Sequence, residues 1–449
     1  MEFSEFILLH EGEDMASLAL QRNRLAADVP DWDLALSTLQ ARRKLRGKLP
    51  SWYAVPSLHY PLPLSAEQCS SEETALYKAI ILNGWDRYCI PKTSDSVLVH
   101  PIAGDGPLPL MCRGRHSFRN TTPTPASIKI ADLTGGLGVD VWAFSRVCEK
   151  VLYNEMKPEL VAAAEHNFKE LGVENVVIRN SAVVPGNSAV MLSNSSVILS
   201  PEGANVSQIL GDFKPDVIFL DPARRDDVGR KVFMLEDCSP NVLELLPELY
   251  EACPRIMLKL SPMADITAVC RQLPGVKEVH VVEADGECKE LLLLLEKGFD
   301  GEYGLYLYAN GVVAQIRRSS RRMTDEAGRF LFVPGKGLMK TGAFWWPESF
   351  GLRQLAASTH MYVGDAKVPE LEPFGKFYDI VETAPLNGRS IKEFGKKYPV
   401  ADVTARNIPM TSEDLRKRLG VKPSDGSVHI FGLQSDSDGR ILISSVISK

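Results

Sequence analysis

The sequence predicts an α/β protein built on a parallel sheet. Three observations lead to this fold class. Strands and helices alternate over residues 125–298, a glycine-rich turn joins the first strand of this region to a helix, and the last two strands form a hairpin. Alternation of this kind needs crossover connections, which make neighbouring strands parallel. In such sheets, ligands bind beyond the carboxyl ends of the strands.

The first predicted strand, 128–132, leads through the turn Leu-Thr-Gly-Gly-Leu-Gly into a helix at 139–147. Glycines allow backbone angles that are closed to other residues, and a helix N-terminus offers free N–H groups to a negatively charged group. A dinucleotide fingerprint needs a third glycine where this chain has Val141, and no Lys-Ser or Lys-Thr follows as in a P-loop. The turn therefore predicts a site for another nucleotide-type cofactor.

The following elements complete the alternation. A strand at 151–156 contains Glu155, seventeen positions after Gly138, where an acidic residue suits the ribose hydroxyls of an adenosine cofactor. The other predicted elements are a helix at 158–171, strands at 175–179 and 216–221, a helix at 241–252, a strand at 255–260, a helix at 264–273, and a hairpin of 278–284 with 290–296.

The acidic strand end, the Gly-x-Gly turn and the closing hairpin resemble the class I S-adenosylmethionine-dependent methyltransferases. The resemblance implies a Rossmann-like class I methyltransferase core, with a seven-stranded sheet that ends in an antiparallel hairpin, and S-adenosyl-L-methionine as cofactor. The implied cofactor-binding residues are Asp132, Thr134, Gly135, Gly136, Gly138, Glu155, Met156 and Asp221. The residue beside adenine is Asn180, Ser181 or Asp212, and residues 181–208 form an insertion read either as a lid or as a surface loop.

The fourth strand ends in a motif that bears on the acceptor, Asp221-Pro222-Ala223-Arg224-Arg225. It resembles the Asp-Pro-Pro-x motif of nucleic-acid base methyltransferases, in which the Asp and the following carbonyls hold an amino group or ring nitrogen. Here Ala223 replaces the second proline, and Arg224 replaces the aromatic on which a flipped base stacks. The predicted catalytic residues are Asp221, Pro222, Ala223 and Arg224, and the predicted substrate contacts in this region are Arg224, Arg225 and Lys259. An ion pair that closes a strand end is the alternative interpretation of Asp221 and Arg225.

The segment after the fifth strand narrows the chemistry. Uridine C5 methyltransferases need a cysteine nucleophile there, and this chain has Lys259-Leu-Ser-Pro262. Direct transfer to a nitrogen or an oxygen is therefore preferred over covalent catalysis at C5. It depends mainly on alignment of the acceptor with the methyl group.

Composition adds further expectations. The 449 residues carry a net charge of −6, and no apolar run approaches the ~20 residues of a membrane helix. The eight cysteines are scattered without a C-x-x-C pair, which is typical of reduced thiols in a cytoplasm, the predicted location. Neither these cysteines nor the histidines have metal-ligand spacing, so no metal is predicted.

Two basic clusters lie outside the core. Residues 42–48 precede Trp52 and Tyr53, which suits a single-stranded polynucleotide as well as it suits a solvated helix end. The second cluster follows a predicted hairpin at 304–316 and supplies the predicted RNA contacts Arg317, Arg318, Arg321 and Arg322.

The C-terminal stretch has its own strand–helix pattern. It predicts a strand at 377–382, a helix at 390–397, a strand at 400–406, a helix at 412–419, and a hairpin of 428–431 with 441–447. Residues 376–449 contain 12 Lys and Arg against 9 Asp and Glu, so this segment is basic in an acidic chain. The pattern resembles the C-terminal THUMP-like domain of bacterial class I methyltransferases. THUMP domains are RNA-binding modules, so the resemblance implies tRNA or rRNA as a partner.

The predicted domains are a mainly helical N-terminal domain at 1–122, the methyltransferase core at 123–298, a small β-rich or ferredoxin-like connector at 299–370, and the THUMP-like α+β domain at 371–449. The predicted function is methylation of a base nitrogen in RNA. The alternatives are an RNA-binding protein that retains the fold without turnover, and a methyltransferase of protein or small molecules. The second alternative would leave the basic clusters without a role.

Overall fold

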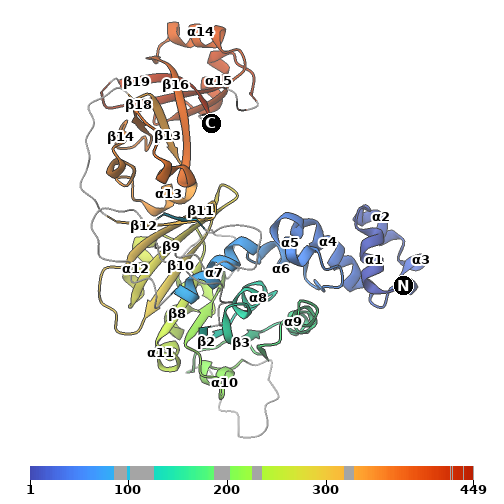
Figure 1. The fold of residues 1–449 in the computed structure, drawn as a ribbon. Helices are drawn as coiled ribbons and strands as arrows, with labels where there is room; N and C mark the ends of the chain where they lie inside the picture. The colour runs from blue at the N-terminus through green and yellow to red at the C-terminus, as the bar shows by residue number, and fades with distance from the viewer. Residues whose placement is uncertain are drawn as a thin grey trace, which may run out of the picture. The chain divides into compact units, whose positions relative to one another are not determined.

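A computed structural model describes residues 1–84, 99–101, 126–186, 203–224, 235–317, 328–424, 426, 428–437 and 439–447 (Figure 1). The chain divides into two compact units. One comprises Met1–Lys92, Gly114–Val279 and Leu291–Tyr303, and the other comprises Thr93–Arg113, His280–Glu290 and Gly304–Lys449. Within the described ranges, no helix is both long and apolar enough to cross a membrane.

The N-terminal region is helical, as predicted. Its helices are α1 (Phe3–His10), α2 (Met15–Leu20), α3 (Arg22–Leu25), α4 (Trp32–Lys48), α5 (Pro50–Tyr53), α6 (Pro63–Gln68) and α7 (Glu72–Gly84). Asp14 and Asp31 cap α2 and α4 by accepting backbone N–H groups, and α5 and α6 each begin with a proline, which needs no N–H partner in the first turn.

The basic cluster at 42–48 is part of this helical packing. The Arg42 side chain is 2% exposed, and its guanidinium donates to Glu11 and to the Tyr53 carbonyl, each at 2.9 Å. Trp52 is fully buried, and Lys48 donates to backbone carbonyls at the end of α6. Arg42 and Trp52 therefore hold the helices together. Because the protein itself covers both side chains, neither Arg42 nor Trp52 is available to contact a polynucleotide.

Residues 126–296 contain the predicted sheet. Its strands are β2 (Ala126–Asp132), β3 (Cys148–Glu155), β4 (Val176–Asn180), β5 (Val217–Leu220), β8 (Arg255–Leu260), β9 (Val276–Ala284) and β10 (Glu287–Glu296). The sheet is ten-stranded, in the order β1-β12-β11-β9-β10-β8-β5-β2-β3-β4. Pairs from β4 to β8 are parallel, and β10 is antiparallel to β8, as expected for the closing hairpin. The seven predicted strands, which run from β9 through β10, β8, β5, β2 and β3 to β4, are confirmed. The sheet continues beyond β9 with β11 (Gly304–Ala309), β12 (Val312–Ile316) and β1 (Val99–Pro101).

The helices of the core connect these strands at the predicted places. They are α8 (Val139–Ser145), α9 (Pro158–Glu170), α10 (Val206–Leu210), α11 (Val242–Ala252) and α12 (Ile266–Gln272). The chain runs from β2 to β3 and β4 on one side, then returns to β5 on the other side of β2. The strand order therefore reverses between β2 and β5, and ligands of such sheets bind at the carboxyl ends of the strands at this point.

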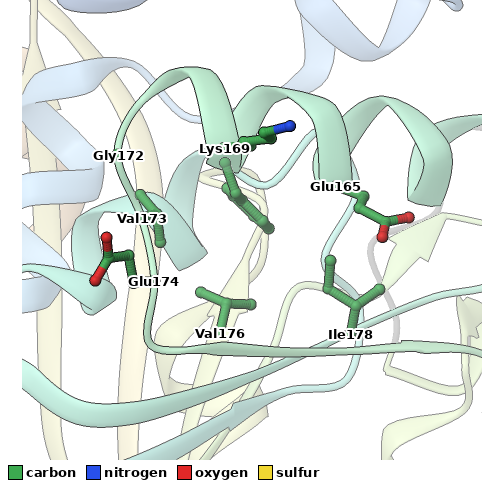
Figure 2. A pocket seen from close by; sticks show the side chains of 8 residues that line it. Glu165, Lys169, Gly172, Val173, Glu174, Val176 and Ile178 are labelled. Atoms are coloured by element: carbon green, nitrogen blue, oxygen red, sulfur yellow. The ribbon is translucent and has the colours of Figure 1, made fainter.

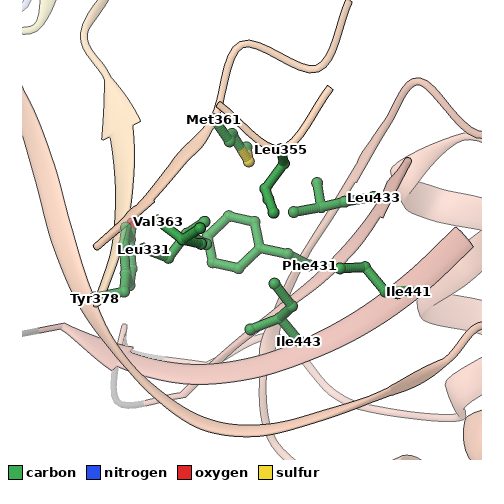
Figure 3. Packing of buried hydrophobic residues seen from close by; sticks show 9 residues of the cluster. All are labelled: Leu331, Leu355, Met361, Val363, Tyr378, Phe431, Leu433, Ile441 and Ile443. Atoms are coloured by element: carbon green, nitrogen blue, oxygen red, sulfur yellow. The ribbon is translucent and has the colours of Figure 1, made fainter. Parts of the chain in front are cut away.

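A seven-stranded sheet with the order β14-β15-β13-β16-β19-β18-β17 lies in the other unit. Its elements are β13 (Phe330–Pro334), α13 (Lys336–Thr341), β14 (Arg353–Gln354), β15 (Tyr362–Gly364), β16 (Gly375–Pro385), α14 (Gly388–Lys397), β17 (Asp402–Arg406), α15 (Ser412–Leu419), β18 (His429–Ser435) and β19 (Gly439–Ile447). Figure 3 shows the Phe431 ring surrounded by apolar side chains of this sheet, among them Leu331 and Ile443. Residues 299–370, predicted as a connector, are divided between the two sheets, because β11 and β12 extend the first and β13 to β15 belong to the second.

Candidate functional site

The glycine-rich turn between β2 and α8 is fixed by two aromatic rings behind it. A Cβ at Gly135 would lie 2.3 Å from the Tyr153 ring, and a Cβ at Gly138 would lie 2.7 Å from the Phe168 ring. Gly138 also has φ +87°, a left-handed backbone that other residues rarely adopt. Tyr153 lies on β3 and Phe168 on α9, and their rings pack edge to face. The glycines are thus required by packing within the protein.

Glu155 closes the turn from the neighbouring strand. It is the last residue of β3 and is buried, and its two carboxylate oxygens accept from Gly136 N and Lys157 N, each at 2.9 Å. An ionised carboxylate accepts about four hydrogen bonds, so this one has room for two hydroxyl donors. Met156, which follows, is 60% exposed and leaves an apolar surface beside the carboxylate. This pair suits a ribose with an attached base.

Asn154 Oδ1 and Ser181 Oγ are among the buried polar atoms near the turn that have no hydrogen-bond partner within the described residues. The Asn154 amide donates to Leu133 O and Ser181 O, each at 3.0 Å, so the two side chains lie beside the start of the turn. Buried polar atoms are normally paired, and these two fit the donors and acceptors of a nucleoside. Of the other adenine candidates, Asn180 donates to Glu155 O and Asp212 is exposed.

Thr134 joins the turn to the acceptor motif. Its N–H donates to the Asp132 carboxylate at 2.9 Å, and its hydroxyl oxygen accepts from Asp221 N at 2.7 Å. The end of β2 and the end of β5 are therefore connected through one side chain. The predicted cofactor residues and the predicted catalytic Asp221 lie together at the point where the strand order reverses.

The carboxylates at this point repel one another. Burial raises the pKa of Asp132 well above its usual range, and the nearby Asp140, Asp221 and Glu155 carboxylates raise it further, while the Thr134 N–H opposes the shift. Like charges held close together favour the binding of a cation.

Asp221 is paired with Lys259. The ammonium at the end of β8 lies 2.5 Å from Asp221 Oδ2, and the Lys259 side chain is 12% exposed. Pro222 is buried, while Ala223 is exposed and starts β6 (Ala223–Arg224), which pairs with β7 (Cys238–Ser239). The structure thus places the Lys259 ammonium on Asp221, where the sequence predicted a substrate contact. The Arg224 side chain and all of Arg225 lie outside the described residues.

Three residues of this site were missed from the sequence: Ser70, Lys78 and Asp140. Lys78, on α7, is fully buried and lies 3.2 Å from Asp140 Oδ1, and Ser70 Oγ donates to Asp140 Oδ2 at 2.8 Å. A single lysine within the apolar run Ala-Leu-Tyr-Lys-Ala-Ile-Ile-Leu was the available signal, because a buried ammonium needs a charged partner. Its partner, on α8, could not be identified from the sequence.

The second basic cluster is described only in part. Arg317 is exposed and its Nε donates to Gln315 at 2.7 Å, whereas Arg318, Arg321 and Arg322 lie outside the described residues. A pocket of about 220 Å³ lies between α9 and the edge strand β4. Val176 and Ile178 project into it (Figure 2). Phe168, which backs Gly138, also lines this pocket. None of the predicted site residues lines it.

Comparisons with known proteins give a family match for the C-terminal segment and a structural match for the whole chain. Residues 375–444 match the THUMP domain-like family. A search of curated proteins gives no match. The crystal structure of a protein from Porphyromonas gingivalis W83, provisionally assigned as a methyltransferase, is similar over 100% of this chain and 98% of that chain, with 25% identity and a TM-score of 0.73.

Two other solved structures are similar over only 38% of the chain. Ribosomal protein L11 methylase from Lactobacillus delbrueckii subsp. bulgaricus has 14% identity, 71% of its chain covered and a TM-score of 0.25. TrmN from Thermus thermophilus has 15% identity, 44% of its chain covered and a TM-score of 0.26.

Proposed function

We propose that this chain, which joins a class I methyltransferase core to a C-terminal THUMP-like domain, is an S-adenosylmethionine-dependent methyltransferase that acts on a base nitrogen of tRNA or rRNA in the cytoplasm. The observation that supports it most is the hydrogen bond between Thr134 and Asp221. It brings the turn assigned to the methyl donor and the motif assigned to the acceptor to one place in the sheet.

The residues around the turn would hold the cofactor. Glu155 accepts the ribose hydroxyls with its remaining lone pairs, and Asn154 Oδ1 and Ser181 Oγ pair with the nucleoside. Asp132, which is fixed by the Thr134 N–H, and the glycine turn would hold the methionine end of the cofactor. When bound, S-adenosylmethionine supplies a methyl group on a sulfonium, which is already a good leaving group.

Asp221 would orient the acceptor. Its Oδ2 is held by Lys259, and its Oδ1 accepts an N–H of the base, which aims the nitrogen toward the methyl group. Asp221 N is fixed by Thr134, so the carboxylate is anchored to the cofactor turn from the backbone as well. Orientation of this kind supplies much of the rate in a transfer that needs little bond activation by the protein.

The THUMP-like domain would bind the rest of the RNA. It carries the excess of basic residues found at 376–449, and Lys396, Lys397, Arg416, Lys417 and Arg418 lie in the last turns of α14 and α15. Basic side chains neutralise phosphates without regard to sequence, so they add affinity, and the target base is selected at Asp221.

One observation favours a second candidate, a non-catalytic RNA-binding protein with the same fold. Ala223 and Arg224 stand where base methyltransferases of the Asp-Pro-Pro type have proline and an aromatic. Loss of the stacking surface would weaken the hold on a flipped base. In that case the chain would bind RNA and transfer no methyl group.

Calorimetry tests the cofactor assignment. S-adenosylmethionine binding is compared among the native chain, Glu155→Gln and the exposed control Glu159→Gln, which lies in the first turn of α9. We expect Glu155→Gln to weaken binding by about tenfold or more, since an ionised acceptor is replaced by a neutral one. Glu159→Gln should bind like the native chain. Absence of binding by the native chain would overturn the assignment.

Transfer of a tritiated methyl group tests the substrate class. The native chain is incubated with labelled S-adenosylmethionine and either total cell RNA or total protein, with Asp221→Asn as the control for the acceptor site. Label in RNA that is lost in Asp221→Asn is the expected result. Label in protein alone would exclude RNA as substrate, and cofactor binding with no label in either fraction would favour the non-catalytic candidate.

A further inference from the structure

We propose that the N-terminal helical region completes the methyl-transfer site, with Ser70 as a positioning residue that holds Lys259 against Asp221. The inference rests on the proposed function for its catalytic consequence. Its structural part rests on a chain of contacts within one compact unit, from α7 through Ser70 to the ends of β8 and β5.

The contacts use Ser70 to its full capacity. Its hydroxyl donates to Asp140 Oδ2 at 2.8 Å and accepts from the ammonium groups of Lys78 at 3.1 Å and Lys259 at 3.4 Å. A serine hydroxyl has one hydrogen to give and two lone pairs to share, and all three are in use here. The orientation of the hydroxyl is therefore fixed, and with it the direction from which Lys259 is held.

The three residues Lys78, Ser70 and Asp140 are buried, so their polar groups depend on one another for partners. Lys78 is 0% exposed, Ser70 is 5% and Asp140 is 8%. The hydroxyl contacts Asp140 and both ammonium groups, while Lys78 is paired with Asp140 and Lys259 with Asp221. In such surroundings an unpaired charge is costly, and loss of one member displaces the others.

The network reaches both halves of the site. Asp140 lies in the first turn of α8, directly after the cofactor turn, and Lys259 contacts the acceptor residue Asp221. The long side chain of a lysine has many rotamers, and a second anchor at Ser70 restricts them. Without it the ammonium is held less firmly against Asp221, and the carboxylate loses part of its fixed orientation toward the acceptor. Cofactor affinity should change little, because Glu155 and the turn keep their own contacts.

Lysine labelling tests the positioning without any need for activity. The native chain, Ser70→Ala and the neighbouring control Ser71→Ala are treated briefly with an amine-reactive ester, and labelling of Lys259 is measured by mass spectrometry. Ser71 accepts from Thr74 N at the start of α7 and makes no hydrogen bond to Lys259 in the described structure. We expect Ser70→Ala to raise labelling of Lys259 by about threefold and Ser71→Ala to leave it unchanged. Equal labelling of Lys259 in both variants would overturn the inference.

Kinetics then separates a positioning role from general stabilisation. Ser70→Ala should lower kcat for methyl transfer to RNA by about tenfold and leave the Kd for S-adenosylmethionine within about twofold, and Ser70→Thr, which keeps the hydroxyl, should recover most of kcat. An unchanged kcat, or equal loss in Ser71→Ala, would contradict the positioning role. If the native chain transfers no methyl group, the proposed function fails, and the labelling of Lys259 still decides whether Ser70 positions it.

Discussion

Replacement of Gly138 by alanine should destabilise the methyltransferase core more than any other glycine change near the turn. The new Cβ would lie 2.7 Å from the buried Phe168 ring, and the backbone would keep φ +87°. A left-handed backbone costs an L-residue about 1–2 kcal/mol. Overpacking against a buried ring adds roughly 1–3 kcal/mol. The sum is about 2–5 kcal/mol, and for a unit of this size each kcal/mol lowers the unfolding midpoint by about 2–4 °C.

Two other glycines separate these contributions. Gly172 has φ +67° with nothing within 4 Å of its Cβ, so Gly172→Ala carries the backbone cost alone. Gly135 has no left-handed backbone, but its Cβ would lie 2.3 Å from Tyr153, so Gly135→Ala carries the overpacking cost alone. Thermal unfolding followed by circular dichroism should give the largest loss for Gly138→Ala. The reasoning is refuted if Gly138→Ala unfolds at the same temperature as Gly172→Ala, and Gly138→Ala with Phe168→Leu should recover part of the loss.

Three further predictions concern the contacts that attach the N-terminal helices to the core. Burial, and to a smaller extent the stacked His166 ring, lower the pKa of His59 from 6.5 to about 4. Because the unfolded chain takes up a proton first as the pH falls, stability is lost between pH 6.5 and 4, by about 1–2 kcal/mol for this partly exposed ring. His59→Gln should therefore reduce the drop in melting temperature between pH 7 and pH 5. Asn167→Ala leaves the His59 N–H and carbonyl without their partners at 2.7 and 2.9 Å, and should cost about 1–3 kcal/mol in thermal unfolding; no change would mean that this contact is absent in solution. Lys78→Met should lower the free energy of unfolding by about 3–5 kcal/mol, because it leaves Asp140 buried without its ammonium partner. Lys78→Met combined with Asp140→Leu should regain most of this stability. A double variant no more stable than the single one would contradict the pairing.

The elements of the core were predictable because their local signals agree with the fold. The strand at 255–260 is found with the predicted bounds, and the helix predicted at 158–171 is found at Pro158–Glu170, because Pro158 starts it and Gly172 follows its end. The closing hairpin was recognisable from the Asp285-Gly286 turn, both of whose residues have positive φ. Such signals are local in sequence, so they can be recognised without knowing which residues pack against the element.

The site was predictable only where its residues lie on the carboxyl ends of strands. Asp132, Glu155 and Asp221 follow from that rule, and the Thr134 contact agrees with it. Ser70 and Lys78 come from a helical region far away in sequence, and nothing in their own neighbourhood identifies Asp140 or Lys259 as a partner. The lysine at 259 was predicted as a substrate contact, and its ion pair with Asp221 was not foreseen, because the sequence does not show which side chains reach it.

The aromatic rings behind the glycine turn affect how this motif should be read across related chains. Gly135 and Gly138 are required by the rings of Tyr153 and Phe168, which are both buried behind the turn. A descendant that lost its methyl donor would still be held to the same glycines for as long as it kept the two rings. The glycines of the turn therefore indicate how β3 and α9 pack against it, and they do not by themselves indicate a bound cofactor. Evolutionary loss of activity should be sought first at Asp221, whose carboxylate contacts the Lys259 ammonium, because the Glu155 carboxylate also holds two backbone N–H groups of the protein.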